Sequence, residues 1–154
     1  MARWHTREDS GIRLDRQLRW WHDDEPIEHP KIVELFNRGL APTDDGRFKL
    51  TVGADWCFVT VEDAAYQVAV LDAHDAQLWL RLSDRTAEPL DPATLALDPD
   101  GVLTAKVKQG RAKARFSRDA QFALGERLTP SGDGVRLDLG GTAVDVPLGA
   151  LGSG

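Results

Sequence analysis

The most restrictive feature of this 154-residue sequence is an alternation of apolar and polar side chains over residues 103–116, interrupted at Gln109 and Gly110. A period of two is that of a β-strand with one buried face. A loop of two residues that ends in glycine is typical of a tight hairpin. We therefore predict a β-hairpin with one apolar and one basic face. A two-residue loop would pair Lys108 with Arg111, Lys106 with Lys113, and Thr104 with Arg115.

The predicted hairpin concentrates positive charge in an otherwise acidic chain. The net charge is −6, but residues 103–118 contain six cations and no acid, so the remaining residues carry −12. Like charges opposite one another destabilise a strand pair, and such a face attracts anions. We expect it to bind an anionic small molecule or an acidic protein partner. The candidate ligand-binding residues are Lys106, Lys108, Arg111, Lys113, Arg115 and Arg118.

Two other interpretations of the basic face remain open. Carboxylates elsewhere in the chain could neutralise it, or it could be a solvated strand face without a partner. A nucleic-acid partner is not expected, because the patch is small and the rest of the chain repels phosphate.

Composition excludes several classes of protein. The single cysteine, Cys57, rules out an intramolecular disulfide framework and a cysteine-only zinc site within one chain, and its apolar surroundings predict a buried core residue. No stretch is long and apolar enough for a membrane-spanning helix, and the first residues lack the apolar core of a signal peptide. We expect a cytoplasmic protein without a cofactor, metal site or catalytic constellation. The oligomeric state stays open.

Two short helices are predicted among the strands. The first covers residues 30–39, because Pro30 suits the first helical position and Gly39 suits a left-handed cap. Its predicted buried face comprises Ile32, Val33, Leu35 and Phe36. The second helix covers about residues 118–126 and is capped by Ser117.

The other elements are predicted to be antiparallel strands. Residues 12–21 form a hairpin of open register, residues 48–82 form a meander of four strands, and residues 83–101 form an irregular connection. Gly140 and Gly141 form a two-residue loop between the last strands. The predicted fold class is therefore α+β, with an antiparallel β-meander and hairpins beside two short helices.

An internal repeat is also predicted. Residues 40–46 and 128–134 align without gaps, sharing leucine, proline, aspartate and glycine at matching positions. The alternative is chance similarity between turns, which commonly use these residues. A repeat would place ββαβ units at residues 11–53 and 102–148, around central strands and a connection at 54–101. These parts could form one compact domain or two lobes, with flexible ends at 1–10 and 149–154.

Several motifs resemble those of a known bacterial family. They are the glycine-led hairpin with its tryptophan and histidine (residues 11–22), the two prolines before the helix (26–30), the segment 61–66, and the hairpin-to-helix junction at 110–118. The sequence resembles, over residues 11–125, a family of domains of unknown function. The resemblance implies repeated sheet-and-helix motifs, a suggested role in signal transduction, and no established catalytic residues.

We therefore interpret the protein as a binding or signalling accessory domain, with two alternatives. One is an enzyme whose site forms between the lobes near His22 and His29, using the carboxylates between them. A solvated acidic turn is the simpler interpretation of these residues, because their spacing fits no known ligand pattern. The other alternative is a structural or oligomerisation domain.

Overall fold

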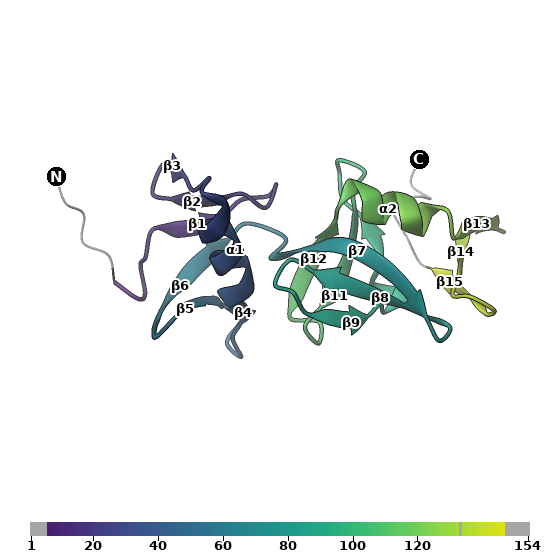
Figure 1. Ribbon diagram of the computed structural model, residues 1–154. Coiled ribbons are helices and arrows are strands. Elements are labelled where there is room, and N and C mark those ends of the chain that lie inside the picture. The colour runs from purple at the N-terminus through teal and green to yellow at the C-terminus, as the bar shows by residue number, and fades with distance from the viewer. Residues whose placement is uncertain (1–5, 133, 147–154) are drawn as a thin grey trace. The chain divides into compact units, whose positions relative to one another are not determined.

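A computed structural model describes residues 6–132 and 134–146. Its strands form three mostly antiparallel sheets accompanied by two α-helices, so the predicted α+β class is confirmed (Figure 1). The chain forms two compact units whose boundary lies between Tyr66 and Gln67. The sequence-based division into 11–53, 54–101 and 102–148 remains a prediction, and the predicted tail at 149–154 lies outside the described residues.

Unit 1 is built on a six-stranded sheet in the order β3-β2-β1-β6-β5-β4, with helix α1. Cα pairing and burial place Leu14, Trp20 and Leu50 in its core. The elements are β1 (Ile12–Leu14), β2 (Trp20–His22), β3 (Glu25–Pro26), α1 (Pro30–Gly39), β4 (Leu40–Pro42), β5 (Phe48–Val52) and β6 (Asp55–Val61).

The pairing of β1 corrects the all-antiparallel expectation. β1 pairs with β2 across a five-residue loop, with Leu14 opposite Trp20, which settles the open register. On its other side β1 runs parallel to β6, with Arg13 opposite Thr60. A parallel pair needs a long connection, and here α1 and the four strands between β1 and β6 supply it.

Helix α1 has the predicted bounds, but its ends are made differently from the prediction. The ring nitrogen Nδ1 of His29 accepts a hydrogen bond from the backbone N of Lys31 (3.2 Å), so a histidine caps the start. Gly39 does not adopt a left-handed conformation, and the chain continues into Leu40 with extended geometry. Glycine is needed because a Cβ there would lie 2.0 Å from the carbonyl oxygen of Thr51.

The predicted buried face of α1 is wrong in part. Ile32 and Leu35 are 39% and 48% exposed, and no residue of the helix is fully buried. Phe36 instead meets the ring of buried Trp20 edge to face, at 5.3 Å between centroids. The indole Nε1 of Trp20 donates to Oδ1 of Asn37 (2.8 Å), so a polar residue takes part in this contact.

Unit 2 contains a second six-stranded sheet, in the order β10-β11-β12-β7-β8-β9, and a three-stranded sheet β13-β14-β15. The elements are β7 (Tyr66–His74), β8 (Gln77–Leu82), β9 (Ala87–Pro89), a 3-10 turn (Pro92–Thr94), β10 (Ala96–Leu97), β11 (Leu103–Val107), β12 (Ala112–Phe116), α2 (Arg118–Gly125), β13 (Leu128–Ser131), β14 (Gly134–Asp138) and β15 (Ala143–Val146).

Two sequence-based expectations are corrected here. The four predicted meander strands pair as β5–β6 and β7–β8, but these hairpins belong to different sheets. The connection at 83–101 is not wholly irregular, because it contains the short edge strands β9 and β10. These short strands pair with β8 and β11 and complete the sheet at its two ends.

The local predictions for the C-terminal part of unit 2 are confirmed. Oγ of Ser117 accepts from the backbone N of Ala120 (3.1 Å) and caps α2. The backbone N of Leu139 donates to the carbonyl oxygen of Thr142 (2.8 Å), which closes the two-glycine loop between β14 and β15.

The order hairpin, helix, hairpin occurs in both units. Residues 40–46 comprise β4 and its turn towards β5, and residues 128–134 comprise β13 and its turn into β14. The sheets differ, however, since β4 and β5 join the six-stranded sheet of unit 1, whereas β13 and β14 lie in a separate sheet. Descent of the two segments from one duplicated sequence remains a prediction.

The start of the chain is more ordered than predicted. Residues 1–5 lie outside the described part, but Ser10 is only 7% exposed and its Oγ donates to the carbonyl oxygen of Phe58 (2.7 Å). The backbone N of Phe58 donates to the carbonyl oxygen of Arg7 (2.7 Å). Residues 7–10 therefore run along β6. Within the described chain, neither helix has the length and apolar character needed to cross a bilayer.

Candidate functional site

The basic hairpin has the register that its sequence predicts. Thr104 lies opposite Arg115 and Lys106 opposite Lys113, across the tight turn at Gln109 and Gly110. The alternate positions are buried and apolar, whereas the lysines and arginines are partly or fully exposed. Thr104 is the exception, being 5% exposed. The side chains of Lys106, Lys113 and Arg115 therefore share the strand face opposite the core, whereas Lys108 (φ 54°) and Arg111 lie in the turn.

Carboxylates of unit 2 engage two of these cations. Nζ of Lys108 lies 2.6 Å from Oδ2 of Asp84, and these side chains are only 21% and 6% exposed. Nε of Arg115 lies 3.8 Å from Oδ2 of Asp98, with exposures of 19% and 8%. Such sheltered pairs are screened less than surface pairs. Lys108 and Arg115 thus have a structural role that joins the hairpin to the 83–101 connection.

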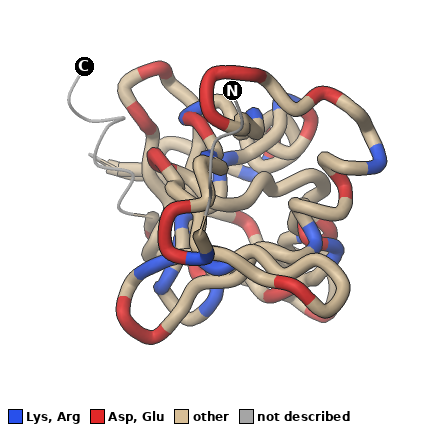
Figure 2. The backbone as a smooth tube through the Cα atoms, turned by 90° about the vertical axis from the view of Figure 1, so that its left-hand side faces the viewer, with Lys and Arg blue, Asp and Glu red and all other residues tan. Residues whose placement is uncertain are grey.

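The other four candidates differ in their surroundings. Arg111 and Lys113 also make interactions within the protein. Lys106 and Arg118 are exposed, and Arg118 lies in the first turn of α2. Figure 2 colours the lysine and arginine positions blue and the aspartate and glutamate positions red along the backbone. The ion pairs thus compensate part of the predicted basic face, and anion binding by this face remains a prediction.

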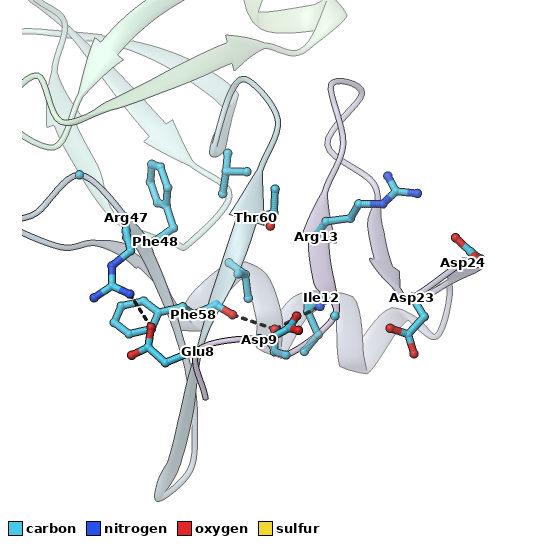
Figure 3. A pocket seen from close by; sticks show the side chains of 15 residues that line it. Glu8, Asp9, Ile12, Arg13, Asp23, Asp24, Arg47, Phe48, Phe58 and Thr60 are labelled. Carbon is cyan, nitrogen blue, oxygen red and sulfur yellow. Dashed lines mark hydrogen bonds and ion pairs between the residues drawn. The ribbon is translucent and has the colours of Figure 1, made fainter. Parts of the chain in front are cut away.

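A hollow lies in unit 1, and its lining includes Asp23 and Asp24 from the acidic turn of the alternative enzyme site. It is an open groove of about 620 Å³, within the usual range of small-molecule sites. It runs along β6 from the start of the chain to the turn after β2, and it combines carboxylates, arginines and aromatic rings (Figure 3). Its lining residues are Glu8, Asp9, Ser10, Gly11, Ile12, Arg13, Asp23, Asp24, Gly46, Arg47, Phe48, Phe58, Val59, Thr60 and Val61.

Separate segments carry the polar side chains of the groove. Glu8 and Asp9 precede β1, and Asp23 and Asp24 occupy the turn between β2 and β3. Asp23 adopts a left-handed conformation (φ 54°), and the backbone N of Asp23 donates to the carbonyl oxygen of Gly11 (2.7 Å). This hydrogen bond holds the acidic turn against the segment that leads into β1.

The two arginines of the groove are already engaged with acids and rings. Arg47 bonds Oε2 of Glu8 through Nη1 (2.7 Å) and lies over the Phe58 ring at 3.6 Å (Figure 3). Arg13 bonds Oε1 of Glu62 through Nη1 (3.1 Å) and lies over the Trp21 ring at 4.7 Å. Since both guanidinium charges are compensated, the remaining carboxylates give the groove a negative potential.

A second acid fixes Arg47 from the other side. Nε of Arg47 donates to Oδ2 of Asp45 (2.9 Å). Hydrogen bonds from Thr43 and then from Arg47 lower the pKa of the Asp45 carboxyl below its ordinary value. Hydrogen bonds to Glu8 and Asp45 raise the pKa of Arg47 above its ordinary value. Arg47 therefore stays charged and in place, so Phe58 is covered by a fixed cation.

The histidine residues do not line this groove. His29 caps α1, and Nε2 of His22 lies 4.0 Å from Oδ2 of Asp23. Among residues 6–132 and 134–146, no group of three or more His, Cys, Asp or Glu side chains is arranged to hold a metal ion. Cys57 is half-buried, which corrects the expectation that it lies in the core.

Sequence reasoning missed the groove because its parts are far apart in the chain. Arg13 and Thr60 become neighbours only through the parallel β1–β6 pair. Glu8 meets Arg47 across 39 positions of sequence. The alternation in β5 and β6 could have placed Arg47 and Phe58 on one sheet face, but no local signal marks Glu8 or Asp9.

Comparison with known proteins gives a likeness of fold. No protein-family model matches the chain, and no curated protein matches it. A crystal structure of a DUF1285 family protein from Silicibacter pomeroyi DSS-3 superposes with a TM-score of 0.64 and 18% identity, covering 88% of this chain and 79% of that one. A crystal structure of a DUF1285 family protein from Shewanella baltica OS155 superposes with a TM-score of 0.56 and 18% identity, covering 76% of this chain and 91% of that one. The chain thus shares its fold with bacterial proteins of a family of unknown function.

Proposed function

We propose that this protein is a binding module and that the groove of unit 1 holds a small organic cation. The observation that carries the proposal is the composition of the groove. Four carboxylates, on Glu8, Asp9, Asp23 and Asp24, line a volume of about 620 Å³. Of the two arginines that line it, Arg47 pairs with Glu8 of the groove itself and with Asp45, and Arg13 pairs with Glu62.

The rest of the lining suits an organic cation better than a bare metal ion. The Phe48 side chain adds apolar surface to the lining, and aromatic faces attract ammonium groups, whereas the Phe58 ring is already covered by Arg47. Carboxylates that line an open groove raise the local concentration of cations, because unlike charges attract over several ångströms in water. A linear diamine or triamine could contact both the Glu8–Asp9 segment and the Asp23–Asp24 turn. Ligand-dependent signalling, the role implied by the family resemblance, would follow from such binding.

Calorimetric titration with putrescine and spermidine tests the groove, with neutral 1,4-butanediol as the uncharged control. We expect the Asp23→Asn/Asp24→Asn variant to bind at least about tenfold more weakly, because each carboxylate contributes on the order of 1 kcal/mol at a few ångströms in water. The matched control is Asp119→Asn/Glu126→Gln, which removes two exposed acids from unit 2. Absence of amine binding, or an equal loss in both variants, would refute the proposal.

Anion binding by the basic hairpin is the second candidate. It is favoured by the exposure of Lys106, which lies opposite Lys113 on the paired strands. Because Lys108 and Arg115 are ion-paired within unit 2, the test uses Lys106→Gln/Arg118→Gln. Titration with pyrophosphate should show weaker binding by this variant.

The control for the second candidate is Lys31→Gln/Arg38→Gln, which removes two exposed cations from α1 of unit 1. Equal pyrophosphate binding by all three proteins would remove the hairpin from consideration. That result would leave the groove proposal intact, because the two experiments use ligands of opposite charge.

A further inference from the structure

Unit 1 contains a second, smaller hollow beside helix α1. Its volume is about 180 Å³, and its lining residues belong to or adjoin α1, β1, β5 and β6. Helix α1 packs mainly on β5, where Gly39 meets the backbone of Thr51. The lining residues are Ile12, Phe36, Leu50, Val52, Asp55, Trp56 and Cys57.

The register explains why this hollow is apolar. Leu50 lies opposite Cys57 on the paired strands β5 and β6, and Val52 lies opposite Asp55. Leu50 is buried, so its strand face is the one that packs towards the core, and Phe36 adds an aromatic ring from α1. Asp55 is the one charged residue of the lining and lies at the solvent side, with a side chain 85% exposed.

Water is a poor occupant of such a pocket. A buried water molecule needs two to four polar partners, whereas an apolar cavity of about 150 Å³ lined by leucine, isoleucine and phenylalanine can hold benzene. The pocket beside α1 has a largely apolar lining and a volume of about 180 Å³, although it is not an enclosed cavity. It is also open, because Val52 at its edge is 36% exposed, so a ligand can enter without unfolding the helix.

We propose that this pocket binds a small single-ring aromatic molecule, with its apolar ring inside and any polar substituent directed to the side of Asp55. The volume fits one ring with a short substituent. Phe36 provides an aromatic neighbour, which favours an edge-to-face contact with a bound ring. The pocket shares Ile12 with the cation groove, but its apolar lining selects a different chemistry.

The single cysteine of the chain provides a direct assay. Cys57 lines the pocket, so a bound ring should shield its thiol from a disulfide reagent. The probes are phenol and benzyl alcohol, with glycerol as the non-aromatic control. At a probe concentration of about ten times its Kd, the modification rate should fall roughly tenfold, because only the unliganded protein reacts. Glycerol should leave the rate unchanged.

A pair of matched variants separates pocket binding from non-specific effects. Val52→Trp should fill the open end of the pocket, whereas Val70→Trp changes a valine of unit 2 with nearly the same exposure, 36% against 37%. Ligand-observed NMR should show saturable phenol binding to the wild type and to Val70→Trp, and a loss of at least fivefold in affinity for Val52→Trp.

Circular dichroism establishes that both variants fold. Unchanged Cys57 reactivity at every phenol concentration, or equal phenol binding by both variants, would overturn the proposal. Neither result bears on amine binding in the larger groove.

Discussion

Asp15 provides the sharpest test of how unit 1 is stabilised. Asp15 lies in the five-residue loop between β1 and β2 and is only 8% exposed, and its side chain closes this loop. Oδ1 accepts hydrogen bonds from the backbone N of Gln17 and of Arg19, both at 2.9 Å. Oδ2 accepts from the indole Nε1 of Trp21, also at 2.9 Å. One carboxylate therefore fixes the loop and orients a tryptophan.

The Asp15→Ala variant removes all three of these acceptor contacts. A hydrogen bond to a charged group contributes about 1.5–3 kcal/mol to stability. Gln17 and Arg19 are exposed, so their N–H groups can turn to water and recover part of the loss. We therefore expect the free energy of unfolding of unit 1 to fall by about 3 kcal/mol. The Asp24→Ala control removes an exposed acid and should change stability by less than about 0.5 kcal/mol.

Urea unfolding followed by tryptophan fluorescence is the appropriate assay. Four of the five tryptophans (Trp4, Trp20, Trp21 and Trp56) precede the boundary at Tyr66, so the signal reports mainly on unit 1. A loss no larger than that of the Asp24→Ala control would show that the loop hydrogen bonds contribute little.

The effect of Asp15 should also depend on pH. Burial raises the pKa of Asp15, but the hydrogen bonds from Arg19, Trp21 and Gln17 outweigh it, and the net pKa lies below its ordinary value. The unfolded chain thus binds the proton more readily, so the stabilisation is complete above the ordinary carboxyl pKa. It is lost as the pH falls through the lower pKa of the folded state. The difference between wild type and Asp15→Ala should shrink over that interval, and a constant difference would contradict the mechanism.

Three further predictions concern other contacts. Gly39→Ala should destabilise unit 1 by about 3 kcal/mol in urea, because its Cβ would collide with the Thr51 carbonyl oxygen; a neutral change would refute the close approach. Asp84→Asn should lower the free energy of unfolding by about 2 kcal/mol, and a double-mutant cycle with Lys108→Met should give a coupling energy above about 1 kcal/mol. Additive effects of the two substitutions on stability would disprove the ion pair. Ser117→Ala should cost about 1 kcal/mol in thermal unfolding through loss of the α2 cap, and an unchanged Tm would contradict it.

Elements whose signals are local were predictable. The basic hairpin has the predicted pairing of Lys106 with Lys113, because the turn at Gln109 and Gly110 sets the register within a few residues. The start of α1 at Pro30 and the capping of α2 by Ser117 followed from proline and serine at the helix starts. In each case the deciding interactions join residues a few positions apart.

Elements that depend on distant partners were not predictable from one sequence. Alternation shows that β6 and β7 are strands, but it does not show that they belong to different sheets. The helical period placed Ile32 and Leu35 on an apolar stripe, yet the sheet covers only part of that stripe. Burial depends on what packs against an element, and the periodicity of the element contains no information about its partner.

The same distinction applies to the candidate sites. Residues 103–118 alone determine that six cations lie close together, and the two-residue period determines that Lys106, Lys113 and Arg115 share a strand face. Only the tertiary structure decided which cations meet acids, since Asp84 reaches Lys108 across 24 positions. It also assembled the groove, by running β1 parallel to β6. Short-range sterics and hydrogen bonds fix the strands and turns, whereas charge compensation and cavities arise where remote segments pack together.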